Sequence, residues 1–304
     1  MKLLKYTAAA VLGAAAAFLC VYFVLAGVLV EAVLHIGGET EAASTAVWSD
    51  GSDSEKIYIT ADDGVELVAL CRRQPSASGK WAIIFHGYTS KKENMLSFAQ
   101  KYYEQGYSVL LPDQRAHGES GGEYCGMGWT ERLDVIRWAE LAAREEPGAE
   151  IVLHGVSMGA SSVLMAAGEG LPESVTALVS DCAFTSVKAI VEYQISRQLG
   201  DAAGLISPGG SLVTRLMAGY GWAEASALDM AAKSTVPILF IHGGADDFVP
   251  TQMVYELYEA AAPPKELLII PEAGHARSAY TDGEKYWTTV FDFIAKHSSM
   301  HKNG

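Results

Sequence analysis

Cysteine is scarce in this chain, with four residues among 304. Cys20 lies inside an apolar stretch, which leaves Cys71, Cys125 and Cys182, an odd number without a CxxC pair. This pattern excludes a disulfide-stapled framework and a thiolate zinc cluster. It leaves open a single disulfide between two of the three remaining cysteines.

Basic residues are few as well. The 22 lysines and arginines against 36 aspartates and glutamates give a formal net charge of −14 at pH 7. A surface this acidic repels a phosphate backbone, so nucleic acid is excluded as a partner. No HExxH or similar ligand spacing indicates a metal site, and no GxGxxG follows the first strand of a βαβ unit. Neither a metal nor another cofactor is therefore expected.

Charge is absent altogether between Tyr6 and Val30. A helix needs about 20 apolar residues to cross a bilayer, so we expect a transmembrane anchor over residues 1–31. Lys2 and Lys5 precede this run, and positive residues tend to stay in the cytoplasm. The sequence therefore predicts a single-pass protein of the cell membrane, with the lipid bilayer as a partner and the rest of the chain on the extracytoplasmic side.

A cleaved signal peptide is the main alternative to an anchor. A buried helix of the soluble core is a less favoured one, since the uncharged run has no polar face. Residues 44–46, Ser-Thr-Ala, could serve as a small-residue cleavage site, although the apolar core of a signal peptide is shorter, about 7–15 residues. Residues 32–53 are rich in Gly, Ala, Ser, Thr and Glu, which favours a flexible stalk after the anchor.

From residue 54 onward, short apolar runs alternate with helical stretches. Continuous apolar strands that alternate with helices indicate a mainly parallel sheet covered on both faces. We therefore predict an α/β domain over residues 54–300. The expected strands are two within 56–72 around an Asp-Asp-Gly turn, then 81–85, 107–111, 151–153, 175–179, 238–241 and 267–270, with helices over 94–105 and 129–144.

The interval 184–235 interrupts this rhythm, because it carries helical pieces but no convincing strand. Ligands of such sheets bind beyond the carboxyl ends of the strands, so an insertion here would form a small helical cap. An ordinary long crossover is the alternative. Apolar residues of this interval are candidates for a substrate entrance, although core packing is their commoner fate: Tyr193, Ile195, Leu199, Leu205, Leu212, Leu216, Met217 and Tyr220.

Ser157 stands between Gly155 and Gly159, directly after the apolar run 151–153. In the predicted architecture this places the serine at the end of a strand and the start of a helix. That is the setting of the GxSxG nucleophile elbow, in which the glycines permit a sharp turn that exposes the serine hydroxyl. A packing serine is the alternative, and a GxSxG match alone carries little weight.

Three further segments follow strands where acyl-transfer chemistry requires them. The loop after 81–85 and the residue after the nucleophile supply oxyanion donors in such enzymes, which predicts the backbone N–H groups of Tyr88 and Met158. His275, after the last strand, is the candidate base, since the other seven histidines lie at strand ends, in a turn or near the chain ends. Asp246 is the candidate acid, with Asp247 and Asp181 as alternatives.

From Ile57 to His297 the chain resembles an α/β-hydrolase of the serine aminopeptidase and bile-acid-acyltransferase-like group, in a membrane-anchored, bacterial-type form. The run 112–120, PDQRAHGES, is similar to the D-x-R-G-H-G-x-S turn of that group, with Ala116 in place of a glycine. The resemblance implies the α/β-hydrolase fold and places the acid of the triad at Asp246. The order Ser157, Asp246, His275 is the chain order of that fold.

These motifs predict a serine hydrolase that cleaves esters of small or medium acyl groups through an acyl-enzyme. A serine peptidase, aminopeptidase or thioesterase is the alternative, because these reactions pass through similar tetrahedral intermediates. A non-catalytic, membrane-tethered binding protein on the same scaffold is a remote alternative, since fold does not fix function.

Overall fold

The computed structural model describes residues 2–34, 54–200, 203–262 and 264–298. Its strands are β1 (Glu55–Thr60), β2 (Glu66–Arg72), β3 (Lys80–Phe85), β4 (Ser108–Pro112), β5 (Glu150–Val156), β6 (Val175–Asp181), β7 (Ile238–Gly243) and β8 (Lys265–Ile270). They form one eight-stranded sheet in the order β1-β2-β4-β3-β5-β6-β7-β8. Strand β2 runs antiparallel to β1 and β4, and the pairs from β4 to β8 are parallel. The predicted mainly parallel sheet is confirmed.

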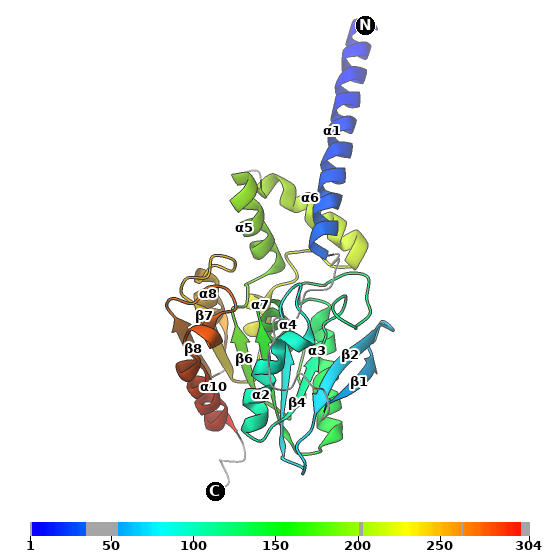
Figure 1. The fold of residues 1–304 in the computed structure, drawn as a ribbon. Coiled ribbons are helices and arrows are strands. Elements are labelled where there is room, and N and C mark those ends of the chain that lie inside the picture. The colour runs from blue at the N-terminus through cyan, green and yellow to red at the C-terminus, as the bar shows by residue number, and fades with distance from the viewer. Residues whose placement is uncertain (1, 35–53, 201–202, 263, 299–304) are drawn as a thin grey trace.

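Helices cover both faces of the sheet (Figure 1). They are α2 (Leu96–Glu104), α3 (Glu131–Glu145), α4 (Met158–Ala167), α5 (Val187–Leu199), α6 (Ala203–Ala218), α7 (Ala227–Ala231), α8 (Gln252–Ala260), α9 (Ser278–Thr281) and α10 (Gly283–His297), with a 3₁₀ turn η1 (Lys92–Met95). Helices α2 and α10 pack on one face, and α3, α4, α7 and α8 on the other.

Side chains of successive strand residues alternate between these two faces. In β3, for example, Ile83 and Phe85 join the core under α3 and α4, whereas Ala82 and Ile84 join the core under α2 and α10. Both faces of the sheet are buried under helices. This explains why the central strands are apolar throughout and do not alternate between apolar and polar residues. This is the α/β-hydrolase fold.

The segment between β6 and β7 carries α5, α6 and α7 and, within its described residues, no strand of the sheet. A single bridge between Ser186 and Ser226 closes the neck of the insertion. Beyond that neck, α5 and α6 stand above the carboxyl ends of the strands, whereas α7 packs against α4 in the body of the domain. The interval 184–235 therefore carries two helices above this edge of the sheet, where the sequence predicts a cap.

The N-terminal helix α1 (Lys2–Leu34) rises from the cap end of the molecule, with α6 beside its base (Figure 1). It continues three residues past the predicted end of the anchor, and residues 35–53 of the predicted stalk lie outside the described part of the chain. The side chains of residues 2–15 and 18 lie outside it too. Among the residues that are described, no helix is long and apolar enough to cross a membrane.

Candidate active site

Ser157 sits on a sharp turn between β5 and α4, with φ 57° and ψ −118°. A Cβ added at Gly155 would collide with the Gly159 carbonyl, and one added at Gly159 would collide with the Phe85 carbonyl. Both positions therefore need glycine, because the turn brings strand and helix into direct backbone contact. The Ser157 N–H donates to the Asp181 carbonyl at 2.8 Å, which holds the turn against β6.

The structure brings the three predicted side chains into one hydrogen-bonded chain. Ser157 Oγ lies 2.8 Å from His275 Nε2, and His275 Nδ1 lies 2.8 Å from Asp246 Oδ2. The three residues come from the end of β5, the loop after β7 and the loop after β8. A carboxylate at Nδ1 fixes the proton on that nitrogen, which leaves Nε2 free to accept the serine proton.

Asp246 is held ionised by its neighbours. Its Oδ1 accepts hydrogen bonds from the backbone N–H groups of Phe248 and Val249, both at 2.9 Å. Burial alone would raise the pKa of Asp246, but hydrogen bonds from His242 and His275 outweigh burial and lower that pKa well below its usual range. The carboxylate is therefore ionised at neutral pH and can orient His275.

Neither alternative acid reaches His275. The Asp247 side chain is 82% exposed and faces Arg197. Asp181 lies fully buried behind the site, where Tyr286 Oη donates to its Oδ2 at 2.9 Å. Burial raises the pKa of Asp181 to about 6.

The predicted oxyanion donors lie on either side of Ser157. Met158 is the first residue of α4, where a helix leaves its N–H groups without internal acceptors, and the Ser157 side chain does not cap it. Tyr88 follows Gly87, whose backbone approaches the Ser157 side chain. Tyr88, Ser157 and Met158 line the same pocket.

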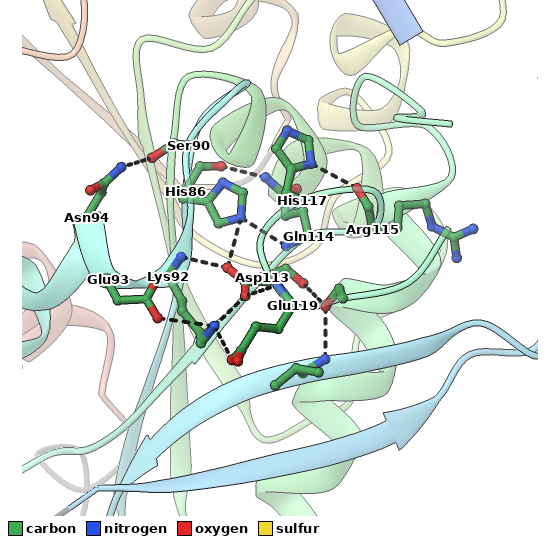
Figure 2. A network of polar contacts seen from close by, with 12 residues as sticks. His86, Ser90, Lys92, Glu93, Asn94, Asp113, Gln114, Arg115, His117 and Glu119 are labelled. Carbon is green, nitrogen blue, oxygen red and sulfur yellow. Dashed lines mark hydrogen bonds and ion pairs between the residues drawn. The ribbon is translucent and has the colours of Figure 1, made fainter. Parts of the chain in front are cut away.

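The run 112–120 is bonded to the Tyr88 loop through two buried histidines, His86 and His117, whose rings are drawn in Figure 2. His86 Nε2 accepts from the Gln114 N–H at 3.0 Å, and His117 Nε2 accepts from the Thr89 N–H at 3.2 Å. Burial lowers the pKa of both imidazoles, that of His86 to about 3. Both rings therefore stay neutral and can act as acceptors.

An ion cluster around the buried pair Lys92 and Asp113 supports the same loop, with the half-exposed Glu119 as its third member (Figure 2). Lys92 Nζ lies 2.5 Å from Asp113 Oδ2 and 2.8 Å from Glu119 Oε2. Burial would lower the pKa of Lys92, but the hydrogen bonds and charges of these carboxylates outweigh burial and raise it. Removing one partner of a buried pair costs about 3–5 kcal/mol, so the cluster locks the run 112–120 to the start of η1.

A pocket of about 380 Å³ opens above Ser157. Its walls come from α5, through Ile190, Ile195 and Leu199, and from Phe248, whose ring centroid lies 4.9 Å from that of His275. Of the predicted entrance residues, Ile195 and Leu199 line the pocket. Tyr220 is buried elsewhere in the core, and Leu205, Leu212 and Leu216 are exposed on α6.

The remaining wall is one that our sequence reasoning missed. Leu25, Leu29 and Val33 of α1 also line the pocket. Their spacing of four residues places them on one face of a helix, and this spacing is the sequence pattern that could have predicted the contact. The pattern does not stand out in the sequence, because the neighbouring residues are mostly apolar too.

Within the described residues, Cys182, Asp246 and His275 form a group whose ligand atoms lie within 4.8 Å of one another. Burial raises the pKa of the Cys182 thiol well above its usual value, so it is neutral and a poor metal ligand. The other two residues use these atoms to bond each other and Ser157. The four cysteines are all unpaired, which answers the disulfide question left open by the sequence.

Comparison with known proteins gives both sequence and fold relatives. Residues 78–212 match the family described as serine aminopeptidase, S33. The chain is 30% identical over 213 residues to the uncharacterized protein YqkD of Bacillus subtilis, covering 70% of each. It is 28% identical to the uncharacterized protein YfhR of Escherichia coli K12, over 81% of this chain and 82% of YfhR. Among solved structures, the esterase Pf2001 of Pyrococcus furiosus has a similar fold, with a TM-score of 0.68 and 23% identity over 86% of this chain and 99% of that one.

Proposed function

The chain belongs to the serine aminopeptidase family of α/β-hydrolases, and from this premise we propose that it hydrolyses carboxylic esters through an acyl-enzyme on Ser157. The observation that carries the proposal is the continuous hydrogen-bonded chain from Ser157 through His275 to Asp246, at the base of an apolar pocket.

The mechanism follows from the atoms that touch. His275 Nε2 takes the Ser157 proton while Oγ attacks the ester carbonyl carbon, and the Tyr88 and Met158 N–H groups stabilise the resulting oxyanion. The imidazolium, held by Asp246, then gives its proton to the leaving alcohol. Water attacks the acyl-enzyme by the same route in reverse, with His275 as base, and releases the acid.

The pocket lining supports an ester over a peptide with a free amino terminus. An aminopeptidase must bind the ammonium group of its substrate, for which a carboxylate is the natural partner. Among the described lining residues there is no aspartate or glutamate, and polar side chains come only from Tyr88, Ser157, Gln194 and Gln198. Thioesters share the tetrahedral chemistry and remain within the same proposal as alternative acyl substrates.

The test is Ser157→Ala in the full chain. We expect the variant to lose turnover of p-nitrophenyl butyrate and labelling by a fluorophosphonate probe, because both require the nucleophile. Ser196→Ala, an exposed change on α5 that does not line the pocket, should retain both. Retention of both activities in Ser157→Ala would reject the assignment and favour a binding protein on this scaffold.

We also propose that the domain works at the extracytoplasmic face of the cell membrane, attached through its N-terminal helix. The support is in the sequence: the uncharged run from Tyr6 to Val30 and the lysines at positions 2 and 5 before it.

A further inference from the structure

Helix α1 presents two adjacent apolar stripes at its C-terminal end. One stripe, Ala26, Val30 and Leu34, is completely buried against the domain. The other, Leu25, Leu29 and Val33, is offset by one residue and lines the pocket above Ser157, with Leu29 and Val33 partly buried and Leu25 61% exposed. Tethering alone does not require α1 to contact the active-site pocket, but residues of its second stripe line that pocket.

The docking of α1 is specific, because Tyr22 enters the hydrogen-bond ladder of α6. Tyr22 Oη donates to the Leu205 carbonyl at 2.9 Å and accepts from the Gly209 N–H at 2.8 Å. These two groups are four residues apart and would otherwise bond to each other in the helix. Pro208 disturbs α6 at this point, and a Cβ at Gly209 would meet the tyrosine ring.

The last turn of α1 is tied to the catalytic loops. Tyr88, whose backbone N–H is the proposed oxyanion donor, donates its hydroxyl to the Val33 carbonyl at 2.8 Å. The Cys125 N–H donates to the Leu34 carbonyl at 2.9 Å. These bonds satisfy carbonyls that a helix end leaves free, and they fix the distance between α1 and the oxyanion site.

Opposite α1 stand Ile190, Ile195 and Leu199 of α5 and Ile206 of α6. The side chains that line this pocket are mostly apolar, and the Ser157 side chain is among them. Such a site recognises an unbranched hydrocarbon chain attached to a carbonyl, because each methylene group placed there leaves water.

We propose that α1 and the cap form an acyl-chain pocket, and that the substrates are esters of medium- or long-chain fatty acyl groups. This inference rests on the proposed serine hydrolase function and names its substrate class. Such an ester can come from a bilayer or from solution. The stripe on α1 makes its two partly buried members, Leu29 and Val33, specificity-determining residues.

The test uses the full chain and p-nitrophenyl esters from acetate to dodecanoate. In the unmodified protein we expect kcat/KM to rise with chain length, by up to about fourfold for each methylene that the pocket buries. Leu29→Trp should fill the pocket and lower kcat/KM for decanoate by about tenfold or more, with acetate changed less than about twofold. Leu29→Ala should weaken the preference for decanoate without blocking the pocket.

Val28→Trp is the matched control, since Val28 is the neighbouring residue, is 64% exposed and does not line the pocket. It should keep the chain-length profile of the unmodified protein. Equal effects of Leu29→Trp on acetate and decanoate, or none on either, would overturn the acyl pocket. If the unmodified protein neither hydrolyses the acetate ester nor reacts with the fluorophosphonate probe, the proposed serine hydrolase function is itself wrong.

A second arm compares p-nitrophenyl decanoate in phosphatidylcholine vesicles with the same ester dispersed below its micellar concentration. Faster turnover from vesicles assigns the bilayer as the source, and faster turnover of the dispersed ester assigns the solution. In both cases sensitivity to Leu29→Trp supports the pocket, and insensitivity contradicts it.

Discussion

The two carboxylate oxygens of Asp246 have different partners. This difference explains why Asp246, and not the adjacent Asp247, suits the role of the acid in the triad. Oδ1 is fixed by two backbone N–H groups of its own loop, whereas Oδ2 faces His275. The loop therefore fixes the orientation of the Asp246 carboxylate, and the carboxylate in turn fixes the orientation of the His275 imidazole. Asp247, one residue later, points to the surface and can do neither.

Asp246→Asn should lower kcat for p-nitrophenyl butyrate by about 10³–10⁴-fold, because an amide can stabilise the wrong tautomer of His275 and cannot stabilise its charged form. The buried Asp181→Asn is the matched control. Its carboxyl group contacts Tyr286 and not His275, so kcat should stay within about tenfold of the unmodified enzyme. A larger loss in Asp181→Asn than in Asp246→Asn would exchange the two roles.

The positions of these residues in the sequence already predicted that they could meet. Ser157, Asp246 and His275 each follow a strand of a parallel sheet, and the carboxyl ends of such strands share one edge. What the sequence did not resolve was which aspartate faces the histidine, since Asp246 and Asp247 are adjacent. That choice depends on the turn after β7, whose backbone bonds only the folded loop defines.

At the scale of elements, the cap is held from two directions. Helix α5 donates to the loop of the acid, through Tyr193 Oη to the Asp247 carbonyl at 3.1 Å and Gln194 Nε2 to the Phe248 carbonyl at 2.6 Å. Helix α6 is held by α1 through the Tyr22 hydroxyl. The cap is therefore coupled both to the triad and to the N-terminal helix.

Tyr22→Phe should loosen α6 without changing the body of the domain. The variant removes the two hydrogen bonds that join Tyr22 of α1 to Leu205 and Gly209 of α6, at a net cost of about 0.5–1.5 kcal/mol for each bond. We expect amide hydrogen exchange in α6 to speed up by about tenfold or more, whereas β5 and α4 stay unchanged. Tyr58→Phe, an exposed change on β1, controls for loss of a hydroxyl, and equal exchange in both variants would refute the link.

Helix α1 marks the limit of what composition predicts. A run without charge indicates an apolar environment, and both lipid and a protein pocket satisfy that condition. The sheet could be predicted because each strand contrasts with polar loops on both sides. In α1 no such contrast separates Leu29, which lines the pocket, from the exposed Val28 beside it.

For the whole molecule, docking of α1 brings the cap close to whatever surrounds the N-terminal part of that helix. Tyr22 bonds to α6, and Ala26, Val30 and Leu34 are buried against the domain, whereas Val24 and Val28 are exposed. One face of the helix is therefore docked, and the other face is open to its surroundings. Exposed leucines of α6, among them Leu205 and Leu216, stand at this same end. In the proposed membrane location, the domain would lie against the bilayer with its pocket near the acyl chains.

Protease treatment of intact cells without an outer barrier tests the proposed location. With Lys2 and Lys5 as the cytoplasmic flank, the hydrolase domain should be digested while cytoplasmic control proteins survive. The net charge of −14 opposes adsorption to anionic lipid, so high salt should not release the protein, whereas detergent should. Full protection of the domain would refute the orientation. Appearance of a shortened, active enzyme in the medium would show that residues before 54 are a cleaved signal, and such an enzyme should also lack the preference for decanoate, because it has lost the α1 wall of the pocket.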